Sequence, residues 1–355
     1  MNLNSKIMIC GYKGMVGSTI VNQLKNEGYK NLFLYGSEEI DFRKQTQVEQ
    51  MFKKIRPEYV FLAAAKVGGI VANNTYKAEF IYDNLAIGLN IIHSAHNVGV
   101  KKLLNLGSSC IYPKFSKQPM KEEYLLSGKL EPTNEPYAIA KIAAIQLCKY
   151  YNEQYNDNFI SIMPSNLYGI KDNYNFETSH VLPAMIRKIL LSKFLKEERF
   201  DLLEKDIKKR GLGFGYDEKI NWNLRSSIKD VLYKLGIFED KVWFLGTGEV
   251  EREFLHVKDL SKACVYFMNN FDFNDIGEFV NVGYGKDISI KDLTILIKNI
   301  INHEVKIVFD KRKHLNGTPK KLLDISKALS FGWKSEITLE NGIKELVKDY
   351  LNEIN

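Results

Sequence analysis

Three glycines near the N-terminus constrain the fold of this chain more than any other feature. Gly11, Gly14 and Gly17 directly follow a short apolar run at 7–10 and open an amphipathic stretch at 16–25. In such a strand–turn–helix unit, the first glycine permits the tight turn and the second lets backbone amides approach a pyrophosphate. The third lets the helix pack closely against the strand. The free N–H groups at the helix start then attract phosphate. The pattern predicts a dinucleotide-binding α/β domain.

The first half of the chain alternates short apolar runs with longer helical patterns. Strands that alternate with helices in this way form a parallel sheet covered on both faces, with ligands at the carboxyl ends of the strands. We therefore predict an α/β fold with a Rossmann-type, doubly wound parallel sheet. The predicted strands are 7–10, 32–34, 59–63, 103–106 and 159–163, and the predicted helices are 16–25, 45–55, 80–97 and 137–155.

The regular alternation ends after Asn166. Residues 192–240 carry several short helical patterns around a glycine-rich centre at 211–215, which is typical of an insertion. Strand patterns return beyond it, so a second domain is expected to interleave with the first. We expect an NAD(P)-binding Rossmann domain over 1–168 with a return at about 241–284, and a smaller α/β substrate domain over 169–240 and 285–355.

Composition excludes several classes of protein. The net charge of +7 comes from 50 basic and 43 acidic residues that are mixed along the chain, as at 193–199, so a nucleic-acid groove is not required. The four cysteines form no C-x-x-C pair, which predicts neither a metal site nor a disulfide framework. No apolar run approaches the ~18 residues of a membrane span, and the start does not resemble a signal peptide. We expect a cytoplasmic protein without a membrane segment.

The end of the second predicted strand bears on cofactor choice. Tyr35-Gly36-Ser37-Glu38 follows it, so no acid stands directly where NAD binders hold the ribose 2′-hydroxyl. Lys13 could pair with a 2′-phosphate, which favours NADPH over NADH, although a solvated loop lysine is an equally good interpretation. Asp41 could border the adenine. The candidate cofactor-binding residues are Gly11, Lys13, Gly14, Met15, Val16, Gly17, Asp41, Ala64 and Lys141.

A tyrosine and a lysine indicate carbonyl reduction. Tyr137 and Lys141 are four residues apart, on one face of a predicted helix, and Ser108 follows the strand at 103–106. Reduction needs a proton at the oxygen as hydride reaches the carbon. A tyrosine can deliver it if a nearby ammonium lowers its pKa from about 10, and a serine hydroxyl can hold the carbonyl oxygen. Tyr-x-x-x-Lys alone is common, but its order after the glycine turn and the serine makes it specific.

Longer motifs extend this interpretation over most of the chain. Together with the residues above, they resemble the GDP-L-fucose synthase family of the extended short-chain dehydrogenases/reductases. The matching segments are 63–74, 107–114, 131–138, 252–257 and 317–324. The resemblance implies an NADPH-dependent 4-keto reductase of a GDP-linked 4-keto-6-deoxy sugar, with C3/C5 epimerase activity and a homodimeric assembly.

The resemblance also assigns roles to individual residues. It places Ser108, Tyr137 and Lys141 in a reductase triad, and Cys110 and His180 in a pair that exchanges protons at C3 and C5. Without it, Cys110 is typical of a small buried residue and His180 of a surface residue at a helix start. The resemblance implies contacts to the sugar nucleotide at Lys188, Arg252 and Lys321, and Asn166, just beyond a predicted strand end, could hydrogen-bond the sugar or the diphosphate.

Two departures from the family keep alternatives open. The family commonly has arginine after the second strand, where this chain has Tyr35 and Ser37, and the stretch 192–240 is longer than the usual connection. That stretch could cap the guanosine, reshape the sugar site, form an oligomer contact or be a solvated outgrowth. The alternatives to the main interpretation are a reductase that acts on a GDP-4-keto-heptose without epimerisation, a nonreductive epimerase with bound NAD, and a non-catalytic dinucleotide-binding regulator.

Overall fold

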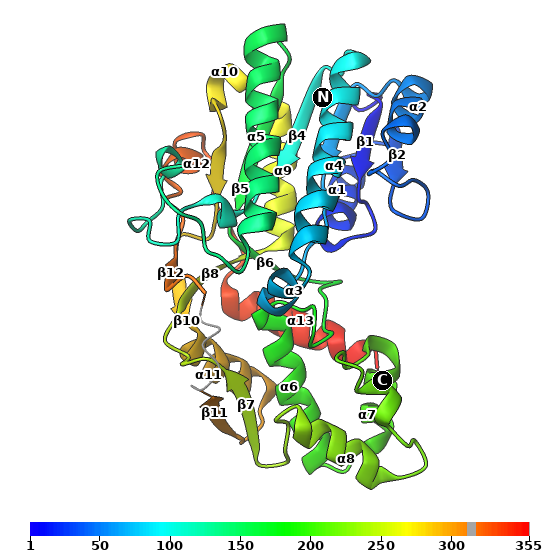
Figure 1. Ribbon diagram of the computed structural model, residues 1–355, viewed down its shortest axis with the longest axis vertical. Coiled ribbons are helices and arrows are strands. Elements are labelled where there is room, and N and C mark those ends of the chain that lie inside the picture. Colours follow the sequence, from blue (N-terminus) through cyan, green and yellow to red (C-terminus); the bar gives the residue numbers. More distant parts are fainter. Residues whose placement is uncertain (311–316, 355) are drawn as a thin grey trace.

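The chain divides into an upper part built on one large sheet and a lower part with smaller sheets (Figure 1). The computed structural model describes residues 1–310 and 317–354. The large sheet has six parallel strands in the order β2-β1-β3-β4-β5-β9. Its strands are β1 (Ile7–Cys10), β2 (Leu32–Tyr35), β3 (Tyr59–Leu62), β4 (Lys102–Leu106), β5 (Phe159–Pro164) and β9 (Val280–Val282).

Both faces of this sheet are buried, which explains why its strands are apolar runs rather than alternating patterns. Ile7 and Ile9 of β1 point into one core, and Met8 and Cys10 point into another. The first core is closed by α1 (Met15–Asn26) and α9 (Val257–Asn270), and the second by α2 (Gln45–Ile55), α4 (Lys77–Asn97) and α5 (Glu135–Tyr155). The predicted doubly wound fold is confirmed.

A second sheet lies directly below the first. Its central strand β8 (Glu251–His256) pairs with β6 (Asn166–Tyr168), β10 (Asp287–Ser289) and β12 (Lys320–Lys321). A third sheet joins β7 (Lys241–Leu245) to β11 (Lys306–Asp310). Within the range 241–284 predicted to return to the first domain, α9 and β9 lie with the large sheet, whereas β7 and β8 lie in the smaller sheets. The apolar sequence of β7 would suit either the large sheet or the third sheet. Its partner, β11, lies far along the chain, so the sequence near β7 does not indicate the pairing.

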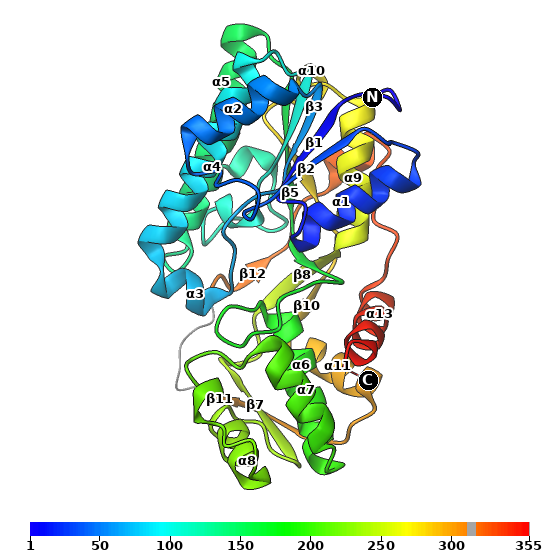
Figure 2. The same ribbon diagram turned by 90° about the vertical axis from the view of Figure 1, so that its right-hand side faces the viewer.

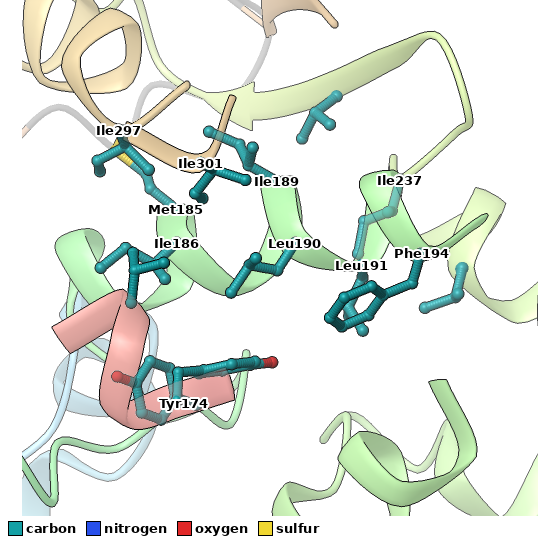
Figure 3. Close-up of a cluster of buried hydrophobic side chains, with 14 of the residues drawn as sticks. Tyr174, Met185, Ile186, Ile189, Leu190, Leu191, Phe194, Ile237, Ile297 and Ile301 are labelled. Carbon is teal, nitrogen blue, oxygen red and sulfur yellow. The ribbon is translucent and has the colours of Figure 1, made fainter. Parts of the chain in front are cut away.

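The lower part has its own apolar core (Figure 3). Its central helix, α6 (Val181–Lys196), is buried on nearly all sides, and Met185, Ile189 and Phe194 lie in the core. Around it pack α7 (Phe200–Arg210), α8 (Arg225–Lys234), α11 (Ile290–Ile301) and α13 (Leu339–Asn352). Because α6 continues to Lys196, the insertion begins after that residue, and we call 197–240 the inserted segment.

Short elements connect the two parts. In both views α3 lies at their junction (Figures 1 and 2). The short helices are α3 (Ile70–Thr75), α10 (Phe273–Ile276) and α12 (Ser326–Ser330), with 3-10 turns η1 (Ser109–Ile111), η2 (Glu122–Tyr124) and η3 (Asp217–Lys219). Among the residues that the structure describes, no helix combines the length and the apolarity needed to cross a membrane.

Candidate active site

The glycine turn between β1 and α1 has the close contacts that its sequence predicts. Gly11 has a φ of +89°, and a Cβ added there would lie 2.7 Å from the backbone of Ala64. A Cβ at Gly17 would lie 2.2 Å from the carbonyl oxygen of Gly11. Because α1 begins at Met15, the N–H groups of Met15, Val16 and Gly17 lack intrahelical acceptors. The turn therefore fits the pyrophosphate of a dinucleotide.

Two carboxylates hold the lysine of this turn. Lys13 forms ion pairs with Glu38 and with Glu39, the latter at 3.1 Å, and Tyr12 donates a hydrogen bond of 2.9 Å to Glu39. The ammonium expected at a 2′-phosphate is thus already paired. These partners are partly exposed, and exposed pairs of this kind contribute little free energy. Lys13 can exchange one anionic partner for another at small cost.

Asp41, expected beside the adenine, is also paired. Arg43 donates to both of its carboxylate oxygens, at 2.9 and 3.0 Å, and reaches Asp83 at 3.2 Å. Hydrogen bonds from the guanidinium hold the pKa of Asp41 below its usual value. Arg43 is a cation that the sequence analysis overlooked. Arg43 lies eight residues beyond the end of β2, two residues after Asp41, and no sequence signal marks it as a cofactor contact.

The lysine of the predicted triad lies at the carboxyl edge of the large sheet. Lys141 donates a hydrogen bond of 2.8 Å to the carbonyl of Leu106, the last residue of β4. Its ammonium lies 5.8 Å from the centroid of the Tyr137 ring. Burial lowers the pKa of Lys141 to about 8. Lys141 of α5 therefore lies against the carboxyl end of strand β4.

The expected lowering of the tyrosine pKa is wrong for this structure. Burial and the neighbouring Cys110 thiol raise the pKa of Tyr137 above its ordinary value, and a hydrogen bond with Ser108 offsets only part of this increase. Spacing alone predicted a charge effect, but it could not predict how deeply the phenol is buried. A raised pKa keeps the hydroxyl protonated at neutral pH, so Tyr137 remains a proton donor.

Three groups surround the Cys110 thiol. Lys321 donates to its sulfur at 3.2 Å, Asn134 donates at 3.4 Å, and Ser108 is a further hydrogen-bond partner. Burial raises the thiol pKa, but the charge of Lys321 and the hydrogen bonds with Ser108 and Lys321 outweigh it, so the pKa of Cys110 is lowered. A lowered pKa makes the thiol easier to ionise, and a thiolate can accept a proton from carbon. Asn134 is a site residue that the sequence analysis missed, although it lies in the quoted segment 131–138.

His180 is the residue that precedes α6. The surrounding protein and the positive charge of Lys321 lower the pKa of His180, so its imidazole is neutral near pH 7 and can accept a proton. The backbone before it is pressed against the motif at 63–74. Gly69 donates a 2.9 Å hydrogen bond to the Thr178 carbonyl, and a Cβ at Gly69 would lie 2.1 Å from the carbonyl oxygen of Ser179.

Three of the four predicted substrate contacts lie on the second sheet. Lys321 of β12 pairs in register with Arg252 of β8, so two cations stand side by side. Asn166 of β6 donates a 2.7 Å hydrogen bond to the backbone of Glu253. The carboxylate of Glu253 accepts hydrogen bonds from the amides of Gly285 and Leu323, and burial raises its pKa to about 7. Glu253 thus fixes the chain beside Lys321.

The fourth predicted contact is placed differently. Lys188 donates hydrogen bonds of 2.7 and 2.9 Å to the carbonyls of Leu235 and Trp243, and burial lowers its pKa to about 8. Its ammonium lies near the Phe176 and Phe244 rings. The structure therefore connects Lys188 to the inserted segment and β7, rather than to the cation pair on the second sheet.

Fold and site together define an enzyme of the dinucleotide-dependent reductase class, with a phosphate-binding turn, a Tyr/Lys pair and a strand-end serine at one sheet edge. The model of the NAD dependent epimerase/dehydratase family matches residues 7–283, and the chain belongs to that family.

Similar proteins match nearly the whole chain. GDP-L-fucose synthase 1 of Arabidopsis thaliana is 43% identical over 99% of this chain and 94% of its own length. A GDP-6-OMe-4-keto-L-xylo-heptose reductase from C. jejuni has a TM-score of 0.92 and 39% identity, and the match covers 99% of both chains. MlghC, a GDP-mannoheptose C4 reductase from Campylobacter jejuni with NADP bound, has a TM-score of 0.87 and 40% identity, again over 99% of both.

Proposed function

We propose that this protein is an NADPH-dependent 4-keto reductase of a GDP-linked 4-keto-6-deoxy sugar and that it also epimerises C3 and C5. The observation that carries the proposal is the placement of two sets of groups around one sheet edge. Tyr137 and the buried Lys141 suit carbonyl reduction, and the Cys110 thiol held by Lys321 suits proton removal from carbon. The relatives named above act on GDP sugars.

Reduction requires a proton at the C4 oxygen. The bound cofactor supplies the hydride that C4 receives. Tyr137 is protonated at neutral pH because its pKa is raised, and it gives its proton to the C4 oxygen. Ser108 can hold that oxygen through its hydroxyl group, and the Lys141 ammonium lies close enough to stabilise the phenolate that remains.

Epimerisation uses the acidity that the C4 ketone confers on C3 and C5. Removal of a proton from either carbon gives an enolate, whose oxygen is held by Ser108 and Tyr137. One of Cys110 and His180 can remove the proton, and the other, in its protonated form, can return one on the opposite face. The pKa of the Cys110 thiol is lowered towards neutral pH, whereas that of His180 is lowered below its ordinary value, which leaves the imidazole free to accept a proton. Whether Cys110 or His180 removes the proton at C3 or at C5 depends on which face of the sugar ring each residue contacts.

The sugar nucleotide needs cations for its diphosphate. Arg252 can bind phosphate oxygens through two N–H groups, whereas Lys321 acts as a point charge that also contacts Cys110. We assign the diphosphate to this pair, with Asn166 as a hydrogen-bonding neighbour. Lys188 would then shape the lower part of the substrate site, because its ammonium is held by two carbonyls.

NADPH is the proposed cofactor. The glycine turn fits the pyrophosphate, and Lys13 and Arg43 are two cations near the end of β2 that can meet a 2′-phosphate. The C. jejuni relative MlghC has NADP bound. The upper part of the molecule would therefore hold the cofactor and the lower part the sugar nucleotide.

We further propose a homodimer that forms through α4 and α5. These long helices pack against each other and present large apolar side chains to solvent. Tyr82 is 64% exposed, Tyr150 is 55% exposed and Leu89 is 47% exposed. Sedimentation at micromolar concentration should give twice the mass of one chain, and charged residues at these three positions should give a monomer.

The sugar is a hexose or a heptose. GDP-L-fucose synthase 1 of Arabidopsis thaliana favours a hexose, whereas the TM-score of 0.92 to the heptose reductase favours a heptose. A panel of GDP-4-keto hexoses and heptoses should decide this through the kcat/KM of NADPH oxidation. We expect one NADPH to be oxidised per sugar for the true substrate. Turnover without loss of NADPH would instead identify a nonreductive epimerase.

A further inference from the structure

The inserted segment contacts the loop that leads to His180. We call residues 169–180, between β6 and α6, the His180 loop. The inserted segment approaches it with the end of α7 and the glycine-rich turn that follows (Figure 1). Two sets of hydrogen bonds join these segments, one buried in the lower core and one nearer the surface.

The buried connection is built on Arg187 of α6. Its guanidinium pairs with Asp206 of α7 at 2.8–2.9 Å, and both side chains are completely buried. The same guanidinium donates to the carbonyls of Tyr174 in the His180 loop and Gly211 in the inserted segment, at 2.8 and 2.5 Å. Tyr350 of α13 also donates to Asp206. One buried cation thus binds both segments through their backbones.

The second connection is the carboxylate of Glu177, three residues before His180. One oxygen accepts a 2.8 Å hydrogen bond from the amide of Phe214 in the inserted segment. The other accepts a 3.0 Å hydrogen bond from the hydroxyl of Tyr76, which directly precedes α4 in the upper part. Glu177 therefore joins three segments that are far apart in the sequence.

The glycine-rich turn of the inserted segment is fitted to the His180 loop. Gly213 has a φ of +80°, and a Cβ added there would lie 2.7 Å from the Asn175 side-chain oxygen and 2.8 Å from Cβ of Glu177. Asp217 accepts hydrogen bonds from the amides of Leu212 and Gly213, which holds the turn in this shape. A bulkier turn would displace the loop before His180.

We propose that the inserted segment is a support that positions His180 for proton transfer, and that Glu177 is its main positioning residue. The proposal rests on the proposed function, in which His180 exchanges a proton with the sugar. Proton transfer requires the imidazole within hydrogen-bond reach of the reacting carbon, and a displacement of about 1 Å can cost about 100-fold in rate. His180 itself forms the start of α6, so its place depends on how the preceding loop is held.

This role differs from those that the sequence left open. The inserted segment is not a solvated outgrowth, because Leu203, Ile207 and Leu232 belong to the lower core. Its polar contacts include those that reach the His180 loop through Arg187 and Glu177, and others that reach Glu353 near the C-terminus. These contacts therefore favour a role of the inserted segment in supporting the His180 loop over a role in covering the guanosine.

The test separates epimerisation from reduction in the full-length enzyme. Glu177→Ala removes both hydrogen bonds of the carboxylate. Gly213→Ala adds a methyl group to the inserted segment that pushes against Asn175 and Glu177 of the His180 loop. Glu177→Gln keeps an acceptor for Phe214 and is the conservative variant. Glu204→Ala is the matched control, because this partly exposed carboxylate of α7 pairs within its own helix, with Lys208. The readouts are deuterium incorporation at C3 and C5 of a GDP-4-keto sugar, and NADPH oxidation with a substrate that is already epimerised.

We expect Glu177→Ala and Gly213→Ala to lower the deuterium exchange at least tenfold, while reduction of the epimerised substrate stays within threefold of wild type. Glu177→Gln should restore most of the exchange, and Glu204→Ala should match wild type. Equal loss of both activities, or unchanged exchange in both alanine variants, would overturn the inference. Absence of exchange in the wild-type enzyme would instead overturn the epimerase part of the proposed function, and this inference with it.

Discussion

The large sheet and the lower core differ in how their elements find partners. In the large sheet, the first five strands are connected through α1, α2, α4 and α5, which pack on the same sheet, so neighbouring segments of sequence are close in space. In the lower core, α6 meets helices from the inserted segment and from the C-terminal region. The upper part thus forms mainly from successive strand–helix units and is completed by the distant α9 and β9, whereas the lower core has no such repeating unit and joins α6 to the distant α11 and α13.

The largest effect is expected in the upper part, where the chemistry resides. Tyr137→Phe removes the proton donor and keeps the buried ring. General acids contribute about 10²–10⁴-fold, so kcat for NADPH oxidation should fall by about that factor. Binding of NADPH, followed by fluorescence titration, should remain within twofold. A turnover within tenfold of wild type would show that another group donates the proton.

This contrast explains what could be predicted from the sequence. The bounds predicted for the strands and helices of the large sheet differ from the observed ones by no more than about three residues, and Lys141 lies against the end of β4 on the same helix as Tyr137. The partner of β7 was not predictable, because its apolar pattern suits any sheet. The raised pKa of Tyr137 and the placement of Lys188 also escaped prediction, since both depend on burial by segments distant in sequence.

In the lower part, the largest expected effect is on stability. Arg187→Met removes one of the two guanidinium partners of buried Asp206, which keeps Arg210 at 3.1 Å, so the cost should stay below the loss of about 3–5 kcal/mol that is typical of breaking a whole buried ion pair. Urea unfolding should show this loss in the free energy of unfolding. The exposed Glu204→Ala serves as control, because its pair lies on the surface and should change stability by less than about 0.5 kcal/mol. A loss below about 1 kcal/mol for Arg187→Met would contradict the buried role.

A smaller effect is expected at the glycine turn of the upper part. Gly17→Ala places a Cβ 2.2 Å from a carbonyl oxygen, so the backbone must shift, and overpacking of this kind costs about 1–3 kcal/mol. Gly14→Ala is the matched control, since its Cβ would lie 3.5 Å from the same oxygen, an ordinary contact. Thermal unfolding without cofactor should therefore separate the two variants. The affinity for NADPH should fall in both variants, because each added methyl group narrows the space in which the pyrophosphate approaches the turn. Unchanged affinity in both variants would show that the pyrophosphate binds elsewhere.

The smallest effect is a shift with pH. Burial lowers the pKa of Lys141 to about 8, so its positive charge is lost as the pH rises through that value. The kcat/KM of reduction should decline on the alkaline side with an apparent pKa near 8, and Lys141→Arg should move this decline upward. The stability effect has the opposite sign. Between pH 8 and 10.5 the unfolded chain holds the proton that folded Lys141 has lost, so stability from this group rises with pH. A kcat/KM for reduction that stays constant up to pH 10 would exclude Lys141 from the reaction.

One measurement tests most directly whether a single site carries out both reactions. A GDP-4-keto-6-deoxy sugar that the enzyme turns over is incubated with NADPH in deuterated water, and the product is analysed by NMR alongside NADPH consumption. The account predicts one NADPH oxidised per product molecule and deuterium at both C3 and C5. Product formed without NADPH oxidation would contradict the account.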